Sequence, residues 1–319
     1  MKQVLEFEKP IVKLREEIEE AKKKLASKPS DKLAQQIADL EAKADALHRD
    51  IHANLSPWQR VQISRHIARP FMLDYVKHIC DEFVELHGDR HIGDDNAMPA
   101  GFATIAGQRV AILGHQKGRD TKENLLRNFG SAHPEGYRKA LRLMRMAEKF
   151  SLPIVTLIDT PGAVPGLGAE ERNIAEASAF NLREMMTLRT PIVAIVIGEG
   201  GSGGALGIGI ADKVLMMENA YYSVISPEGC AAILWKDRKF APDAAQSLKL
   251  SAQDLSKLGI IDGIVPEPLG GAHNDHFASA ASLKNAVLAA LKELAALPTA
   301  KLLEQRYQKF RALGQFTEA

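Results

Sequence analysis

Apolar residues at helical spacing open the chain. They step by three and four positions over residues 11–25, a break follows at 28–30, and the same spacing continues over 33–51. This pattern predicts two helices joined by a short turn and packed as an antiparallel hairpin. Two such helices bury little surface by themselves. We therefore expect this hairpin, residues 1–55, to lie against a larger body or to dock a partner subunit.

The central part of the chain begins with helix and then turns to short β-prone runs. Ser56-Pro57 is a typical helix start, and further helix is expected to about His87. Two β-prone runs, 101–106 and 109–114, flank Gly107-Gln108 and predict a β-hairpin.

From there, buried strands and helices alternate. The expected strands are 153–159, 191–197, 213–217 and 221–225, and an apolar run covers 260–265. The expected helices are 136–150, 170–188, one beginning at Ser226-Pro227, one after a capping box of Ser251 and Asp254, and two from about Phe277. This alternation predicts an α/β fold with parallel crossovers.

Two glycine-rich segments mark the place where chemistry is expected. Segments 159–168 and 198–206 each follow a predicted buried strand, where open α/β sheets usually bind ligands. Glycines expose bare backbone amides, and amides at a helix start carry partial positive charge. Such amides can stabilise a negative charge that develops during a reaction, as in an oxyanion hole.

The same segments leave two other enzyme classes open. Gly198-x-Gly200-x-x-Gly203, with Glu218 twenty residues on, matches the dinucleotide fingerprint of a nicotinamide-dependent oxidoreductase. Ser202 stands between Gly200 and Gly204 in a Gly-x-Ser-x-Gly pattern, and His133 or His273 could be the base of a serine hydrolase. A non-catalytic assembly protein built around the helical hairpin is a further alternative.

Other polar residues are candidates for substrate contact. His115 ends a predicted strand, and Lys117 opens a basic stretch that continues to Arg127 and could bind phosphates. The Asp159-Thr-Pro-Gly162 segment is typical of GTPase switches, but the chain has no Gly-x-x-x-x-Gly-Lys-Ser/Thr loop to hold the phosphates.

Composition narrows the classes of partner and compartment. The 319 residues include 41 basic and 40 acidic ones, a net charge of +1, so neither nucleic acid nor an anionic membrane is expected as a partner. The two cysteines, Cys80 and Cys230, lack the spacing of a disulfide framework or a zinc site. With no signal peptide or membrane span in the sequence, we expect a cytoplasmic protein without a metal of its own.

Several longer sequence segments resemble one family, the α subunit of bacterial acetyl-CoA carboxylase carboxyltransferase. The resemblance runs from the hairpin to the last helices. It is carried by Gly114-His-Gln-Lys-Gly-Arg, Asn128-Phe-Gly, Pro134-Glu-Gly-Tyr-Arg-Lys-Ala-Leu-Arg, Ile158-Asp-Thr-Pro-Gly-Ala, Gly168-Ala-Glu-Glu-Arg, Ile197-Gly-Glu-Gly-Gly-Ser-Gly-Gly-Ala and Tyr222-Ser-Val-Ile-Ser-Pro-Glu-Gly-Cys.

The resemblance implies a crotonase-like fold, a ββα superhelix, over residues 56–296, with a C-terminal helix at 297–319. It also implies a β subunit on another chain that brings a zinc ribbon and most coenzyme A contacts, in an α2β2 assembly. Biotin carboxyl carrier protein and biotin carboxylase are further implied partners, and no cofactor is expected to be bound covalently.

The activity implied by the resemblance is transfer of a carboxyl group from carboxybiotin to acetyl-CoA, giving malonyl-CoA for fatty acid synthesis. Both halves of that reaction build negative charge on oxygen. The backbone amides expected to stabilise it are those of Gly200, Gly201, Gly203 and Gly204. The residues expected to bind substrate are Gly162, Ala163, Glu170, Arg172, His115 and Lys117.

Overall fold

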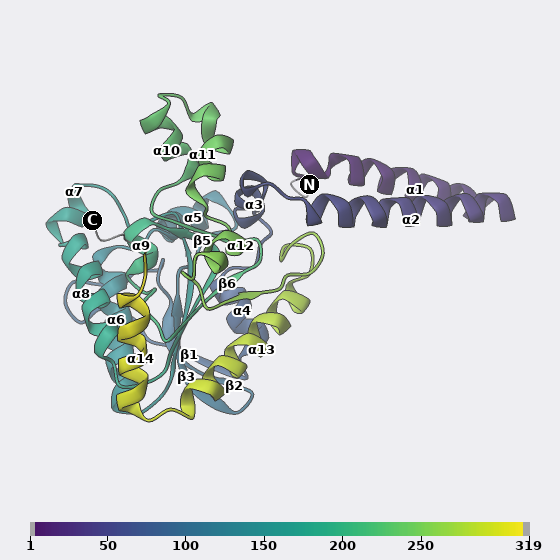
Figure 1. The fold of residues 1–319 in the computed structure, drawn as a ribbon. Coiled ribbons are helices and arrows are strands. Elements are labelled where there is room, and N and C mark those ends of the chain that lie inside the picture. The colour runs from purple at the N-terminus through teal and green to yellow at the C-terminus, as the bar shows by residue number, and fades with distance from the viewer. Residues whose placement is uncertain (1–3, 315–319) are drawn as a thin grey trace.

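The computed structural model describes residues 4–314 and contains one eight-stranded sheet with helices on both faces (Figure 1). The strands are β1 (Glu82–Glu85), β2 (Ala100–Ile105), β3 (Gln108–Gly114), β4 (Ile154–Thr160), β5 (Ile192–Gly201), β6 (Lys213–Met217), β7 (Tyr221–Ser223) and β8 (Gly263–Val265). The predicted α/β class is confirmed. Three residues of the predicted hairpin segment, 1–3, and five of the predicted C-terminal segment, 315–319, lie outside the described residues.

Helices make up most of the remaining structure. The α-helices are α1 (Lys9–Ser27), α2 (Asp31–Ala53), α3 (Pro57–Ser64), α4 (Met72–Ile79), α5 (Thr121–Leu126), α6 (Pro134–Lys149), α7 (Leu167–Glu171), α8 (Ile174–Thr187), α9 (Ser202–Leu206), α10 (Pro227–Leu234), α11 (Ala241–Leu248), α12 (Ala252–Lys257), α13 (His276–Ala295) and α14 (Thr299–Arg311). Short 3-10 turns are η1 (Glu6–Glu8), η2 (Asn128–Gly130) and η3 (Arg238–Phe240).

The sheet combines an antiparallel edge with a parallel centre. Its order is β1-β2-β3-β4-β5-β6-β8, and β7 pairs with the end of β5. The pairs β1–β2 and β2–β3 are antiparallel, whereas all pairs from β3 onward are parallel. The predicted hairpin is confirmed with its turn one residue earlier, at Ala106-Gly107, where both residues have positive φ.

The core lies on both faces of the central strands. Every residue of β4 and β5 is buried, as their β-branched sequences predict for parallel strands covered on two sides. Helices α6, α8 and α14 cover one face, and α4 and α13 cover the other (Figure 1). Because β3, β4 and β5 run in one direction, their carboxyl ends meet at one edge of the sheet.

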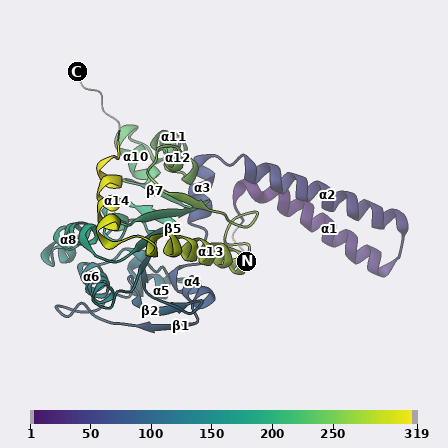
Figure 2. The same ribbon diagram turned by 60° about the horizontal axis from the view of Figure 1, so that its bottom comes forward.

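The N-terminal hairpin is confirmed and projects away from this body (Figure 2). Its helices pack through a narrow apolar seam around Ile18, Ile37 and Ala44. A second small cluster of Leu5, Leu55 and Ile63 joins the base of the hairpin to α3. The division of the chain at residue 55 stays a prediction, although it coincides with the junction between the hairpin and the body.

Three local predictions are corrected. The region up to His87 is not all helix, because Glu82–Glu85 forms edge strand β1 against β2. The helix expected over 170–188 is interrupted at Asn173, whose left-handed φ of 63° separates α7 from α8. The strand expected to end at residue 197 is longer, because β5 continues to Gly201 and pairs there with β4 and β7.

Candidate active site

The two glycine-rich segments meet at the carboxyl ends of β4 and β5. Thr160 of β4 pairs with Gly200 of β5, so the segments that follow these strands start side by side. A Cβ atom on Gly204 would lie 2.4 Å from the Ala163 amide nitrogen, and one on Gly201 would lie 2.2 Å from the Pro161 carbonyl oxygen. The backbones therefore touch at a distance that only glycine permits.

Gly203 differs from its neighbours because one side of it is open. A Cβ atom built there would meet no other atom within 4 Å, and the residue is exposed. It lies at the start of α9, where amides have no partners within their own helix. The structure thus brings the predicted residues Gly162, Ala163, Gly203 and Gly204 together around an open backbone surface.

Ser202 has a strained backbone at the same point. Its φ is +51°, in the left-handed region that residues with a side chain rarely adopt. Ser202 links the end of β5 directly to α9, and its side chain is exposed. The strain accompanies the abrupt change from extended strand to helix that presents Gly203.

Beneath the glycine segments lies a buried cluster of charges. Lys117 Nζ donates to Asp159 Oδ1 at 2.6 Å and to Glu199 Oε1 at 2.7 Å. The Glu199 amide also donates to Asp159 Oδ1 at 2.8 Å. Gly198 makes room for this arrangement, because a Cβ there would lie 2.5 Å from the Asp159 carboxylate. Lys117 therefore ties the ends of β4 and β5 together.

The charge cluster extends to the far side of Glu199. Arg65 Nε donates to Glu199 Oε2 at 2.6 Å, and the Tyr221 hydroxyl donates to the same oxygen at 2.8 Å. A second ion pair joins Arg65 to Glu228 of α10. Burial alone would raise the pKa of Glu199, but the charges of Lys117 and Arg65 lower it to about 2.

Sequence reasoning did not identify Arg65, Asp159, Glu199 or Tyr221 as parts of one cluster. The sequence did contain a signal for a buried ion pair. Asp159 and Glu199 each follow a run of apolar strand residues, and an acid buried there needs a partner. The partner could not be read from the sequence, since Lys117 and Glu199 are 82 positions apart.

His115 lies behind the charge cluster. It has no exposed surface, and within the described residues neither ring nitrogen has a hydrogen-bond partner. Burial, assisted by the charge of Lys117, lowers the pKa of His115 to about 3, so the ring is neutral at physiological pH. A contact between His115 and a substrate stays a prediction.

Glu170 and Arg172 lie beside the first glycine segment. Arg172 Nε donates to Glu135 Oε1 of α6 at 2.7 Å, and Arg138 donates to the Arg172 carbonyl oxygen. Glu170 is exposed near the end of α7. These contacts fix the short helix α7 against the start of α6, on the flank of the open backbone surface.

The two alternative enzyme readings do not match this geometry. The dinucleotide fingerprint needs a tight turn before a helix, yet Gly200 lies within β5, α9 has five residues, and Glu218 accepts a hydrogen bond from the Glu267 amide. For the hydrolase, no hydrogen bond within the described residues joins Ser202 to either candidate base: His133 lies 3.7 Å from Asp95, and His273 stacks on His66.

The remaining polar candidates are engaged elsewhere. Arg119 donates to the carbonyls of Ile67 and Arg69, and Arg127 pairs with Glu123. In residues 4–314, no group of three or more His, Cys, Asp or Glu side chains could hold a metal ion. In the same part of the chain, no helix combines the length and apolar character that a membrane crossing needs.

Comparison with known proteins decides the family. The family model described as acetyl co-enzyme A carboxylase carboxyltransferase-like matches residues 4–314. The α subunit of the acetyl-coenzyme A carboxylase carboxyl transferase of Geobacter metallireducens is 57% identical over 98% of both chains. The chain belongs to this carboxyltransferase α-subunit family. The corresponding subunit of Synechococcus elongatus is 55% identical over 99% of this chain and 96% of its own length.

Solved structures show that this carboxyltransferase family member has the predicted crotonase-like fold. Transcarboxylase 12S matches with a TM-score of 0.58 at 19% identity, covering 75% of this chain and 45% of that longer chain. A Pseudomonas malonate decarboxylase hetero-tetramer, solved with coenzyme A, matches with a TM-score of 0.59 at 16% identity, covering 73% of this chain and 91% of its own.

Proposed function

We propose that this chain is the α half of a two-chain carboxyltransferase that moves a carboxyl group from carboxybiotin to acetyl-CoA, giving malonyl-CoA. The observation that carries the proposal is the convergence of the two glycine segments on one open backbone surface. Gly204 packs against Gly162 and Ala163, while Gly203 leaves its neighbouring space free. Membership of the carboxyltransferase family supports the same reading.

The chemistry needs stabilisation of negative charge on two oxygens. When the bond between the biotin nitrogen and its carboxyl carbon breaks, carbon dioxide leaves and the electron pair spreads onto the ureido oxygen. The biotin nitrogen then takes a proton from the acetyl methyl group, which leaves an enolate on the thioester. The enolate carbon attacks carbon dioxide to form the new carbon–carbon bond. No side-chain base is required.

The backbone amides supply that stabilisation in our proposal. Gly203 and Gly204 at the start of α9 are the proposed donors to the ureido oxygen, and Gly162 and Ala163 form a second, weaker pair. The amides of Gly200 and Gly201 were also expected to be donors, but both residues lie in β5 and pair with β4 or β7. We therefore propose that these two glycines allow the strands to approach closely, since their sites have no room for a Cβ atom. Donors held by a rigid sheet need no reorganisation as charge develops.

The other candidate residues support this surface. Glu170 and Arg172 border it on the side of α7, where they are proposed to contact substrate. Lys117 is proposed to hold the two strand ends in register, with neutral His115 packed behind it. In that role Lys117 fixes the glycine amides, and the expected contact between Lys117 and substrate stays a prediction.

The names of the relatives point to one partner. Those relatives are called α subunits, which implies a β subunit. We propose an α2β2 assembly in which the β chain brings a zinc ribbon and most of the coenzyme A site, while the biotin carboxyl carrier protein delivers carboxybiotin made by biotin carboxylase. Such an assembly would work in the cytoplasm.

The reverse half-reaction tests the proposal. Malonyl-CoA-dependent carboxylation of free biotin would be measured with this chain alone, with a β subunit alone, and with the two mixed. We expect turnover only in the mixture, because each chain supplies part of the site. A stable mixed complex without turnover would contradict the proposed activity.

A further inference from the structure

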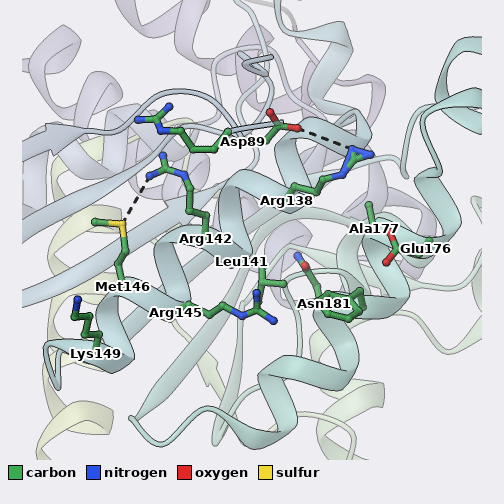
Figure 3. Close-up of a pocket in the computed structure, with 12 residues that line it drawn as sticks. Asp89, Arg138, Leu141, Arg142, Arg145, Met146, Lys149, Glu176, Ala177 and Asn181 are labelled. Carbon is green, nitrogen blue, oxygen red and sulfur yellow. Dashed lines mark hydrogen bonds and ion pairs between the residues drawn. The ribbon is translucent and has the colours of Figure 1, made fainter. Parts of the chain in front are cut away.

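A groove of about 610 Å³ runs between α6 and α8, on the flank of the body (Figure 3). Four of its cations lie on one face of α6, because positions 138, 142, 145 and 149 repeat at helical spacing. A fifth comes from the loop before β2. The charged residues that line the groove are Arg90, Arg138, Arg142, Arg145 and Lys149, against Asp89 and Glu176.

The positive charge of the groove is partly compensated, because Arg145 forms an ion pair with Glu184 at 2.7 Å, whereas Arg142 and Lys149 have no ion pair within the described residues. Arg138 Nη1 lies 3.9 Å from Asp89 Oδ2, and within the described residues both buried atoms lack a hydrogen-bond partner. Arg142 donates to the carbonyls of His87 and Gly88, which are neutral. Burial, and then the nearby charge of Arg90, lower the pKa of Arg142. Crowded cations of this kind favour a multivalent anion.

The floor of the groove is apolar. Leu141, Met146, Ala177 and Phe180 line it between the charged residues, and the Arg145 guanidinium lies 5.5 Å from the Phe180 ring. A bare inorganic anion would leave this surface uncovered. A ligand that joins several negative charges to a flat organic group would use both parts of the groove.

We propose that this groove binds a nucleotide through its diphosphate or triphosphate chain, with the base against the apolar floor. Arg142 and Lys149 of α6 offer charge-assisted donors for the phosphate oxygens, and Arg145 would share its guanidinium between the ligand and Glu184. The free nucleotides ADP and ATP share this chemistry with the adenosine diphosphate portion of coenzyme A. Both sources therefore enter the test.

The groove is separate from the glycine surface but connected to it through α6 and α8. At the start of α6, the Tyr137 hydroxyl donates to the Gly204 carbonyl, whereas the groove extends from Arg138 roughly 16 Å along the helix to Lys149. Asn181 lines the groove and donates to the carbonyls of Tyr137 and Gly207. A bound ligand would thus contact the wall that supports α9.

Calorimetric titration of the full-length chain with ADP tests the site. We expect Arg142→Gln to weaken binding at least tenfold. The double variant Arg145→Gln/Lys149→Gln should do the same through two exposed positions that leave the Arg142 contacts in place. Arg189→Gln, an exposed cation in the turn after α8, is the matched control and should bind like the unmodified chain.

Simpler ligands separate the contributions of charge and base. Adenosine should bind at least tenfold more weakly than ADP, and pyrophosphate should also bind more weakly than ADP. If adenosine bound as tightly as ADP, the cations would not contribute to binding. If pyrophosphate bound as tightly as ADP, the apolar floor would not contribute. Either result overturns the proposal. No ADP binding at millimolar concentration would also overturn it.

Titration with coenzyme A tests whether the diphosphate that binds belongs to a free nucleotide or to the coenzyme. If ADP or ATP binds more tightly than coenzyme A and is lost in the double variant, the groove is a site for free nucleotides. If coenzyme A binds more tightly and is lost in the same variant, the diphosphate of the coenzyme is the occupant. Binding of either ligand that survives in the double variant contradicts the assignment to this groove.

Discussion

Strand β5 is held by buried ion pairs at both ends, and the two ends differ in what surrounds them. At the amino end, Arg306 of α14 makes two hydrogen bonds to Asp212, which accepts a further one from the Ile192 amide. At the carboxyl end, Glu199 joins Lys117 and Arg65. The first cluster is closed by protein on every side, and the second lies next to open backbone at Gly203.

The difference separates stability from function within one strand. Arg306 also donates to the carbonyls of Met185, Leu188 and Thr190, so it closes the end of α8 next to the start of β5. The opposite cluster aligns strand ends whose amides remain available. Similar chemistry therefore stabilises the fold at one end and presents a site at the other.

The largest effect is expected from a substitution at the amino end of β5. Arg306→Leu should lower the free energy of unfolding by about 3–5 kcal/mol, because it leaves the Asp212 carboxylate buried without its partner. Chemical denaturation would measure the loss. Molecules that remain folded should keep normal turnover with a β subunit. A large loss of turnover per folded molecule would show that the two ends are not separate in function.

The next largest effect is expected from a substitution beyond the carboxyl end of β5. Gly203→Val should reduce turnover by about 10²–10³-fold, because the added side chain covers the proposed amide donors. The melting temperature should change little, since a Cβ at Gly203 meets no atom within 4 Å apart from its chain neighbours and its own helix. Gly93→Val is a matched control, as its Cβ also meets no other atom and it lies outside the site. Normal turnover of Gly203→Val in an intact complex would refute the donor assignment.

Gly204 should respond differently from Gly203, because its site has no room for a side chain. A Cβ at Gly204 would lie 2.4 Å from the Ala163 amide nitrogen, so even alanine must displace the first glycine segment. Gly204→Ala should therefore lose both turnover and thermal stability, in contrast to Gly203→Val. Equal melting temperatures for the two variants would contradict the close approach of the segments.

A pH titration sharpens the comparison. Glu199 has a folded pKa of about 2 against an ordinary 4.5, so its contribution is present above pH 4.5 and is lost as pH falls towards 2. That contribution is about 3 kcal/mol. Urea unfolding at pH 6 and pH 3 should show a smaller loss of stability in Glu199→Gln than in the unmodified chain. An equal loss would mean that Lys117 and Arg65 do not hold this carboxylate ionised.

The smallest effect concerns Ser202. Ser202→Gly should stabilise the chain by less than about 1 kcal/mol, because glycine adopts the φ of +51° without strain. Turnover should remain within a few-fold of normal, since the proposed donors are backbone amides. Loss of turnover in Ser202→Gly, together with labelling of the unmodified chain by a serine-reactive probe, would favour the hydrolase alternative instead.

Much of this site could be predicted because glycine is conspicuous in a sequence. The density of glycines after two buried strands located Gly162, Gly203 and Gly204, and parallel strand direction implied that the segments meet. The extension of β5 to Gly201 was missed because glycine is unfavourable in strands. Here a larger residue has no room, since the Pro161 carbonyl lies against Gly201.

The features that escaped prediction depend on contacts between distant parts of the chain. Edge strand β1 has four residues and a weak pattern, and it is fixed by pairing with β2. The break at Asn173 interrupts a continuous helical pattern, and nearby Arg172 is held by Glu135 of α6. Such pairings have no local signature, whereas the N-terminal hairpin was predictable because its seam repeats at helical spacing.

The projecting hairpin of α1 and α2 affects how the size of any assembly is measured. A helix of 23 residues is roughly 34 Å long, so each copy carries a thin arm beyond its body (Figure 2). Frictional drag depends on shape as well as mass. The protein should elute earlier from a gel-filtration column and sediment more slowly than a sphere of equal mass. Light scattering, which reports mass directly, is therefore the appropriate way to count subunits in a complex with a β chain.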